Sequence, residues 1–113
     1  MDLPSSFKFL DDGLNHRLIG LVKKSGLKHV VGPEGVIRYS PGDAEEMENK
    51  LIFSVRRRAF PSWQVQTCPP DWVGRYKEYM TRRDIPFTEE LADDQIWFLL
   101  PRKYRPHAWK LDR

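Results

Sequence analysis

The run Ile-Trp-Phe-Leu-Leu at residues 96–100 is continuously apolar, and Pro101 follows it directly. A short run of this kind, bounded by a turn residue, is typical of a strand covered on both faces, because a strand with one exposed face alternates apolar with polar side chains. We therefore predict a central strand at residues 96–100. The remaining segments must supply the strands beside it and the helices packed against it.

The segments before this strand contain a strand pattern, a helix pattern and an acidic stretch. Residues 62–68 alternate apolar with polar or small side chains, which is the period of a half-buried strand. A helix is predicted between this strand and residue 84. Its apolar face consists of Trp72, Tyr76, Tyr79 and Met80. Residues 87–94 are acidic and show neither the helical nor the strand period of apolar residues, so we interpret them as a loop.

The strongest helix signal begins at Ser40. Ser40 is a natural N-cap, Pro41 suits the first helical position, and Asp43 is placed to reach back to the cap. The predicted apolar face consists of Ala44, Met47, Leu51 and Val55, widened by Ile52 and Phe53. Three arginines at residues 56–58 occupy the last turn, and the Phe-Pro pair at 60–61 ends the helix.

The N-terminal part contains a helix pattern and a hairpin pattern. Residues 11–25 combine two aspartates at the start, apolar residues at helical spacing, and Gly26 directly after the end. Two short β-branched runs at 29–31 and 36–39 are joined by a loop with two glycines, which predicts a hairpin. Residues 1–10 show no clear element, and we treat them as a segment that can fray.

These elements predict the order α-β-β-α-β-α-β in one α+β domain that spans residues 1–113. Two strand–helix–strand crossovers and the hairpin give a four-stranded mixed sheet with helices packed on it, a sandwich. The length of 113 residues suits one domain, and no linker-like segment divides it. Residues 101–113 are basic and aromatic without a usable period, and we expect them to form a C-terminal strap across the surface.

Composition excludes several classes of protein. The chain has 19 Lys and Arg against 16 Asp and Glu, a formal net charge of +3, and 40% apolar residues, which indicates a folded and slightly basic domain. No apolar run reaches the roughly 18 residues of a membrane helix, and the first residues lack the pattern of a secretory signal. The single cysteine excludes an internal disulfide and is typical of a reducing compartment, so we predict a cytoplasmic protein.

The charges alternate in blocks along the chain. Residues 56–83 hold seven bases and two acids, whereas residues 84–100 hold five acids and no base. One interpretation gathers the cations into a basic face beside exposed aromatics, as single-stranded nucleic acid requires. Its members are Arg56, Arg57, Arg58, Arg82, Arg83, Arg102, Lys103 and Arg105. The other interpretation places the arginines at helix C-termini and pairs them with the acidic residues 89–94, and the small net charge favours it.

Catalytic and metal-binding candidates are few. Cys68 is the one nucleophile in a suggestive position, between a predicted strand and a predicted helix, where amide dipoles lower the pKa of a thiol. Asp71 opposes this effect, no second cysteine follows, and a lone cysteine at a strand end is more often a small buried apolar residue. The histidines His16, His29 and His107 lack the helical spacing of metal ligands. We therefore predict no metal site and no cofactor, and Cys68 is only a weak catalytic candidate.

The C-terminal segment is the strongest candidate for partner binding. Tyr, Trp and Arg are the residue types most enriched at interface hot spots, and this segment supplies all three. The predicted contact residues are Arg102, Tyr104, Arg105 and Trp109, with Arg57 and Arg58 as an electrostatic rim. Trp109 has an alternative role, which is to pin the tail onto its own domain. The sequence thus predicts a non-catalytic accessory module that binds another protein, with nucleic-acid binding as the alternative and a Cys68-based enzyme or redox sensor as a weaker third hypothesis.

Overall fold

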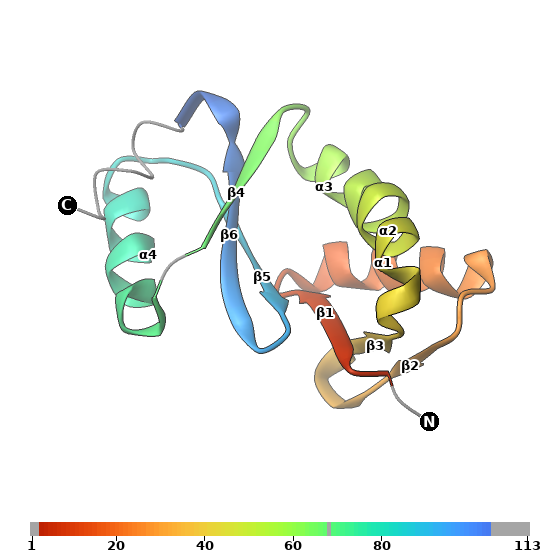
Figure 1. Cartoon of the computed structure of the whole chain (residues 1–113). Coiled ribbons are helices and arrows are strands. Elements are labelled where there is room, and N and C mark those ends of the chain that lie inside the picture. The colour runs from red at the N-terminus through yellow and green to blue at the C-terminus, as the bar shows by residue number, and fades with distance from the viewer. Residues whose placement is uncertain (1–2, 68, 105–113) are drawn as a thin grey trace.

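Six strands form one sheet in which every neighbouring pair is antiparallel (Figure 1). The computed structural model describes residues 3–67 and 69–104. The strands are β1 (Ser5–Phe9), β2 (His29–Val31), β3 (Ile37–Tyr39), β4 (Trp63–Thr67), β5 (Thr88–Ala92) and β6 (Gln95–Pro101). Their order across the sheet is β2-β3-β1-β5-β6-β4, so β2 and β4 are the two edges.

Helices cover both faces of this sheet. On one face, α1 (Asp12–Ser25) packs beside a continuous helical segment made of α2 (Ala44–Glu46), a π-helical turn (Met47–Ile52) and α3 (Phe53–Ala59). On the opposite face lies α4 (Val73–Arg82), as Figure 1 shows. None of the helices in the described ranges is long and apolar enough to cross a membrane.

Strand β6 shows why both faces are covered. Leu99 packs into the cluster beneath α1 and α3, whereas Phe98 and Leu100 pack against α4, and each of the three is at most 1% exposed. Successive side chains of a strand point to opposite faces, so an uninterrupted apolar run requires a layer on each side. The predicted doubly covered strand is confirmed, with β5 and β4 as its neighbours.

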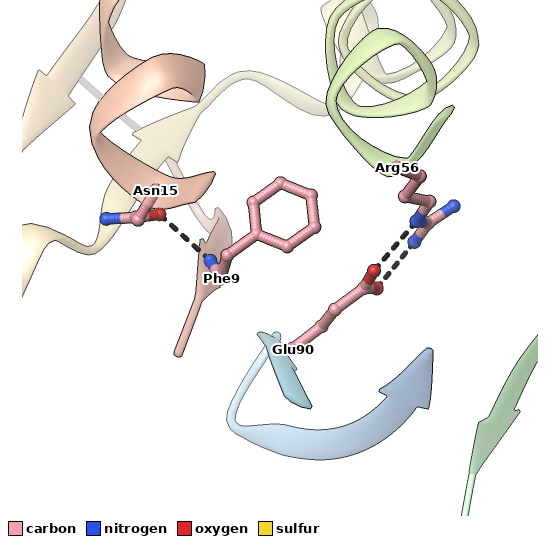
Figure 2. Close-up of polar contacts among 4 residues, drawn as sticks. All are labelled: Phe9, Asn15, Arg56 and Glu90. Atoms are coloured by element: carbon pink, nitrogen blue, oxygen red, sulfur yellow. Dashed lines mark hydrogen bonds and ion pairs between the residues drawn. The ribbon is translucent and has the colours of Figure 1, made fainter. Parts of the chain in front are cut away.

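Polar contacts hold the start of α1. The Asp11 carboxylate accepts a hydrogen bond from the Leu14 backbone N–H at 2.9 Å, which confirms the predicted N-cap. Buried Asn15 accepts from the Phe9 N–H at 2.9 Å (Figure 2), and its Nδ2 donates to the Gly35 carbonyl at the same distance. Gly35 has a φ of +79°, and a Cβ there would lie 2.7 Å from Asn15 Nδ2. Asn15 therefore joins β1, α1 and the β2–β3 loop, and this arrangement requires glycine at position 35.

The predicted α+β class is confirmed, but the predicted four-stranded mixed sheet and the order α-β-β-α-β-α-β are wrong. Two strands, β1 and β5, were not predicted, and both lie in the middle of the sheet between β3 and β6. β1 falls within residues 1–10, which we had treated as able to fray. β5 falls within residues 87–94, which we had interpreted as a loop.

β1 is so short that its period is weak. Phe7 and Phe9 are buried with their rings edge to face, 5.0 Å between centroids, and they alternate with Ser6 and Lys8. Five residues carry little periodic signal by themselves. The burial comes from helices distant in sequence, which a local pattern does not reveal.

β5 becomes a strand through the turn that joins it to β6. The turn residues Asp93 and Asp94 have φ values of 49° and 67°. Positive φ at both central residues suits the twist of a two-residue hairpin, and aspartate tolerates it better than most residues. The Asp93 carboxylate accepts from the Ser6 N–H at 2.9 Å, and the Asp93 N–H donates to the Ser6 carbonyl at 3.1 Å. The turn is thereby tied to β1.

The predicted crossovers do not join neighbouring parallel strands. β3 and β4 run in the same direction, but β1, β5 and β6 lie between them. The second predicted crossover joins β4 and β6, which are direct neighbours but antiparallel. The unpredicted strands β1 and β5 fill the first gap, and the β5–β6 hairpin reverses the chain before β6, so the sheet is antiparallel throughout.

Tyr39 on β3 is a titratable group placed in the core. The residue is only 4% exposed. Burial, reinforced by the carboxylates of Glu48 and Asp93, raises the pKa of its phenol to about 12 from the usual 10.0. Because the folded protein holds this proton more tightly than the unfolded chain does, stability that is complete below pH 10 is lost as the pH rises toward 12.

We predict that the free energy of unfolding falls by about 2–3 kcal/mol through Tyr39 as the pH rises from roughly 10 to 12. Urea denaturation of the wild type and of Tyr39→Phe across this range isolates the contribution, because the variant lacks the ionisable phenol. The wild type should lose stability more steeply than the variant. Parallel curves for the two proteins would contradict the prediction.

Candidate functional site

A buried ion pair links the helices to the centre of the sheet. Glu90 on β5 is 1% exposed, and its carboxylate accepts from Arg56 Nε at 2.8 Å and from Arg56 Nη2 at 2.6 Å (Figure 2). The Arg56 guanidinium also lies over the Phe7 ring, 5.9 Å from its centroid. A bidentate arginine is the partner that a buried carboxylate requires. Arg56 is therefore a structural residue and not part of a free basic surface.

The interpretation that gathers the cations on one basic face does not agree with the structure. α3, which carries Arg56–Arg58, and α4, which ends at Arg82, pack on opposite faces of the sheet. Several cations are also engaged inside the molecule: Arg82 pairs with Glu78, and Arg83 lies over the Tyr79 ring at 3.9 Å. The alternative interpretation, pairing with acidic residues 89–94, is confirmed for Arg56 and Glu90, and Lys77 pairs with Glu89 at 3.2 Å.

The structure divides the predicted partner-binding residues. Arg57 and Arg58 are exposed on the last turn of α3. Arg102 follows β6, and its Nε lies 3.5 Å from the Trp63 carbonyl oxygen at the start of β4. Tyr104 instead packs against the apolar cluster on the α4 side. The remaining predicted contacts, Arg105 and Trp109, lie outside the described residues, as do His107 and Cys68.

An exposed phenylalanine and a partly buried tryptophan form an aromatic pair near two of the arginines. Phe53 is 43% exposed, and its ring meets Trp63 edge to face with centroids 4.9 Å apart. Arg57 is one helical turn after Phe53, and Arg102 reaches the Trp63 carbonyl. We call Phe53, Trp63, Arg57 and Arg102 the aromatic–basic surface.

Sequence reasoning placed Phe53 on the apolar face of its helix. The π-helical turn shifts that face, so that Met47, Ile52 and Val55 are buried and Phe53 points outward. Three successive apolar residues at 51–53 cannot all face one side of a regular helix, and this was the available signal. The local pattern did not reveal which of them would face solvent.

A cleft of about 540 Å³ lies at the other end of β4, beside the start of α4. Gln66, Thr67, Val73 and Ile96 line it, with Asp94 at one side. These residues offer amides, a hydroxyl and one carboxylate over an apolar floor, which are groups that bind a ligand or a side chain. Within residues 3–67 and 69–104, no group of three or more His, Cys, Asp or Glu residues is placed to hold a metal ion.

Comparisons with known proteins give no relative from which a function could be transferred. No family model, no curated protein and no solved structure matches this chain. The functional interpretation therefore depends on the chain's own residues, and the aromatic–basic surface includes two of the predicted contact residues, Arg57 and Arg102.

We predict that Arg56→Ala lowers the free energy of unfolding by about 3–5 kcal/mol, because it leaves the Glu90 carboxylate buried without a partner. The control is Arg57→Ala, which removes an exposed arginine from the same helical turn and should change stability by less than about 0.5 kcal/mol. The double variant Arg56→Met, Glu90→Leu should recover most of the loss, because no unpaired charge remains. Equal effects of Arg56→Ala and Arg57→Ala in urea denaturation would show that the ion pair is not structural.

Proposed function

We propose that this protein is a small non-catalytic accessory module that binds another protein through the aromatic–basic surface. The observation that carries the proposal is the exposed Phe53 ring, held against Trp63 near Arg57 and Arg102. The partner's contact segment is expected to combine an apolar side chain with carboxylates. The single cysteine suits work in a reducing compartment such as the cytoplasm.

The energetics of exposed side chains support this use. A half-exposed phenylalanine gains free energy when a partner removes its apolar surface from water. Its contact with Trp63 limits its rotamers, so less conformational entropy is lost on binding. Aromatic and arginine side chains are also those most enriched at interface hot spots. Phe53 therefore combines the chemistry and the preorganisation of a contact residue.

The free charges support an acidic partner. Arg57 and Arg58 form no ion pair with any residue in the described part of the chain. Arg56 in the same turn is neutralised by Glu90, so only the outer two arginines project charge into solvent. Complementary charges accelerate association and fix the orientation of a partner. Arg105 and Trp109 stay predicted contacts on sequence grounds alone.

Binding of nucleic acid remains the alternative. It would use the same arginines, with Phe53 and Trp63 as stacking platforms. The separation of α3 and α4 onto opposite faces and the internal pairing of Arg56 and Arg82 leave a smaller continuous basic area than this alternative requires. This small basic area favours a protein partner over nucleic acid.

We predict that Phe53→Ser abolishes retention of the protein partner in a pull-down from a lysate of the source cells, before and after nuclease treatment. Leu10→Ser is the matched control, because Leu10 is 40% exposed and directly follows β1, whereas Phe53 begins α3. The same partner should be retained by the wild type and by the control variant. Arg57→Ala should weaken retention, and Arg17→Ala, which removes an exposed arginine of α1, should not.

Two outcomes would overturn this proposal. A partner that Phe53→Ser retains as strongly as Leu10→Ser does would show that the aromatic–basic surface is not the contact. Retained material that disappears on nuclease treatment, together with a steep loss of binding in salt, would favour the nucleic-acid alternative. Circular dichroism of all four variants establishes that each is folded.

A further inference from the structure

Strand β4 presents an open backbone at the edge of the sheet. The Arg102 N–H donates to the Ser62 carbonyl at 3.1 Å, and Trp63 lies opposite Pro101, which has no N–H to donate. Hydrogen-bonded pairs alternate along an antiparallel ladder. The backbones of Gln64 and Gln66 are therefore bonded to β6, and those of Trp63, Val65 and Thr67 point away from the sheet.

Within residues 3–67 and 69–104, no strand pairs with this edge, although Gln66 Nε2 donates to the Thr67 carbonyl at 3.1 Å and Arg102 Nε lies 3.5 Å from the Trp63 carbonyl. Exposed edge strands are commonly shortened or given charged side chains that prevent pairing with another chain. β4 is five residues long and contains no charged residue, whereas the opposite edge strand, β2, has only three residues. The prolines that would prevent backbone pairing lie only outside β4, at Pro61 and Pro69.

The sequence around β4 is nearly symmetric. Residues 61–69 read Pro-Ser-Trp-Gln-Val-Gln-Thr-Cys-Pro, with Val65 at the centre, glutamine on each side of it and proline at each end. The outward-pointing positions 63, 65 and 67 are spaced evenly about the same centre, although Trp63 and Thr67 differ in type. A two-fold interface requires a surface that is complementary to itself, and a strand with this arrangement meets that requirement.

We propose that two copies of this chain form a dimer by pairing their β4 strands antiparallel about a two-fold axis at Val65. Trp63 then lies opposite the partner's Thr67, and Gln64 lies opposite the partner's Gln66. The three outward-pointing residues of each chain exchange about six backbone hydrogen bonds. The two sheets become one continuous sheet, and the amides of Gln64 and the partner's Gln66 lie close enough to bond to each other.

Charge along the edge favours this occupant. Arg57 and Arg102 lie near the start of β4, next to the aromatic pair. Asp94 lines the cleft with Thr67 at the end of β4, and Asp71 lies in the turn that follows. Antiparallel pairing sets the basic start of each strand against the acidic end of the other, so the same attraction operates twice.

The dimer is compatible with the contacts already described. Arg102 Nε is 3.5 Å from the Trp63 carbonyl, a long contact that leaves the oxygen able to accept from the partner's Thr67 N–H. The pairing shares Trp63, Arg57 and Arg102 with the aromatic–basic surface, but it uses the backbone of β4 and not the Phe53 side chain on which the proposed binding function rests. The dimer therefore goes beyond that function and does not depend on it.

Sedimentation equilibrium of the full chain, from low micromolar to millimolar concentration, tests the proposal, with a reductant present to prevent cross-linking through Cys68. The wild type should approach twice the monomer mass of 13.4 kDa. Val65→Pro removes an outward N–H that makes no bond within the sheet, and it should raise the dimer dissociation constant roughly tenfold or more. Val31→Pro is the matched control at the opposite edge, where the Gly32–Val36 hydrogen bond shows that the Val31 N–H also points outward.

A second variant guards against misfolding of the proline variant. Gln64→Lys with Gln66→Lys leaves the backbone unchanged and sets like charges against each other across the axis, so it should also yield a monomer. A wild type that stays monomeric at every concentration would overturn the proposal and leave the edge to another occupant, such as residues 105–113 or a different polypeptide. The proposal would also be overturned if the lysine double variant formed a dimer with the same dissociation constant as the wild type and the Val31→Pro control.

Discussion

A glutamate in the middle of the sheet imposes the constraint on which the rest of the structure depends. Glu90 lies between Phe9 of β1 and Trp97 of β6, beneath a layer of helices. A carboxylate in that place is strongly destabilising unless a cation reaches it with good geometry. Arg56 does so from the last turn of α3, which couples the position of that helix to the register of β5. The same pairing removes one arginine of three from the surface.

Much of the fold follows from local sequence. The elements that could not be predicted are those that depend on tertiary contacts. The caps at Asp11 and Gly26, and the uninterrupted apolar run of β6, place their elements correctly because each signal is local. β5 was missed because an acidic segment forms a central strand only when Arg56, 34 residues earlier, neutralises it. β1 was missed because the burial of Phe7 and Phe9 depends on helices that follow in the chain. With those two strands absent, the predicted sheet was necessarily too small.

The candidate site was predictable only in part. Sequence composition indicated Arg57 and Arg102 as contact residues, and the structure places Arg57 one helical turn after Phe53 and Arg102 Nε 3.5 Å from the Trp63 carbonyl. Phe53 was not indicated, because the π-helical turn that exposes it has no recognisable local signature. The near-symmetry of residues 61–69 is visible in the sequence, but it acquires meaning only once β4 is known to be an edge strand with β6 on one side. The order of strands in a sheet depends on the whole chain and cannot be deduced from one segment.

The acidic segment at residues 88–92 forms a central strand that is held by an ion pair. Amide hydrogen exchange at Glu90 and Leu91 of β5 tests it most directly, because the rate reports whether these N–H groups are bonded between β1 and β6. We predict exchange that requires opening of the whole core, as slow as that of Leu99 in β6. Exchange at the rate of an exposed loop, while Leu99 remains protected, would contradict the account.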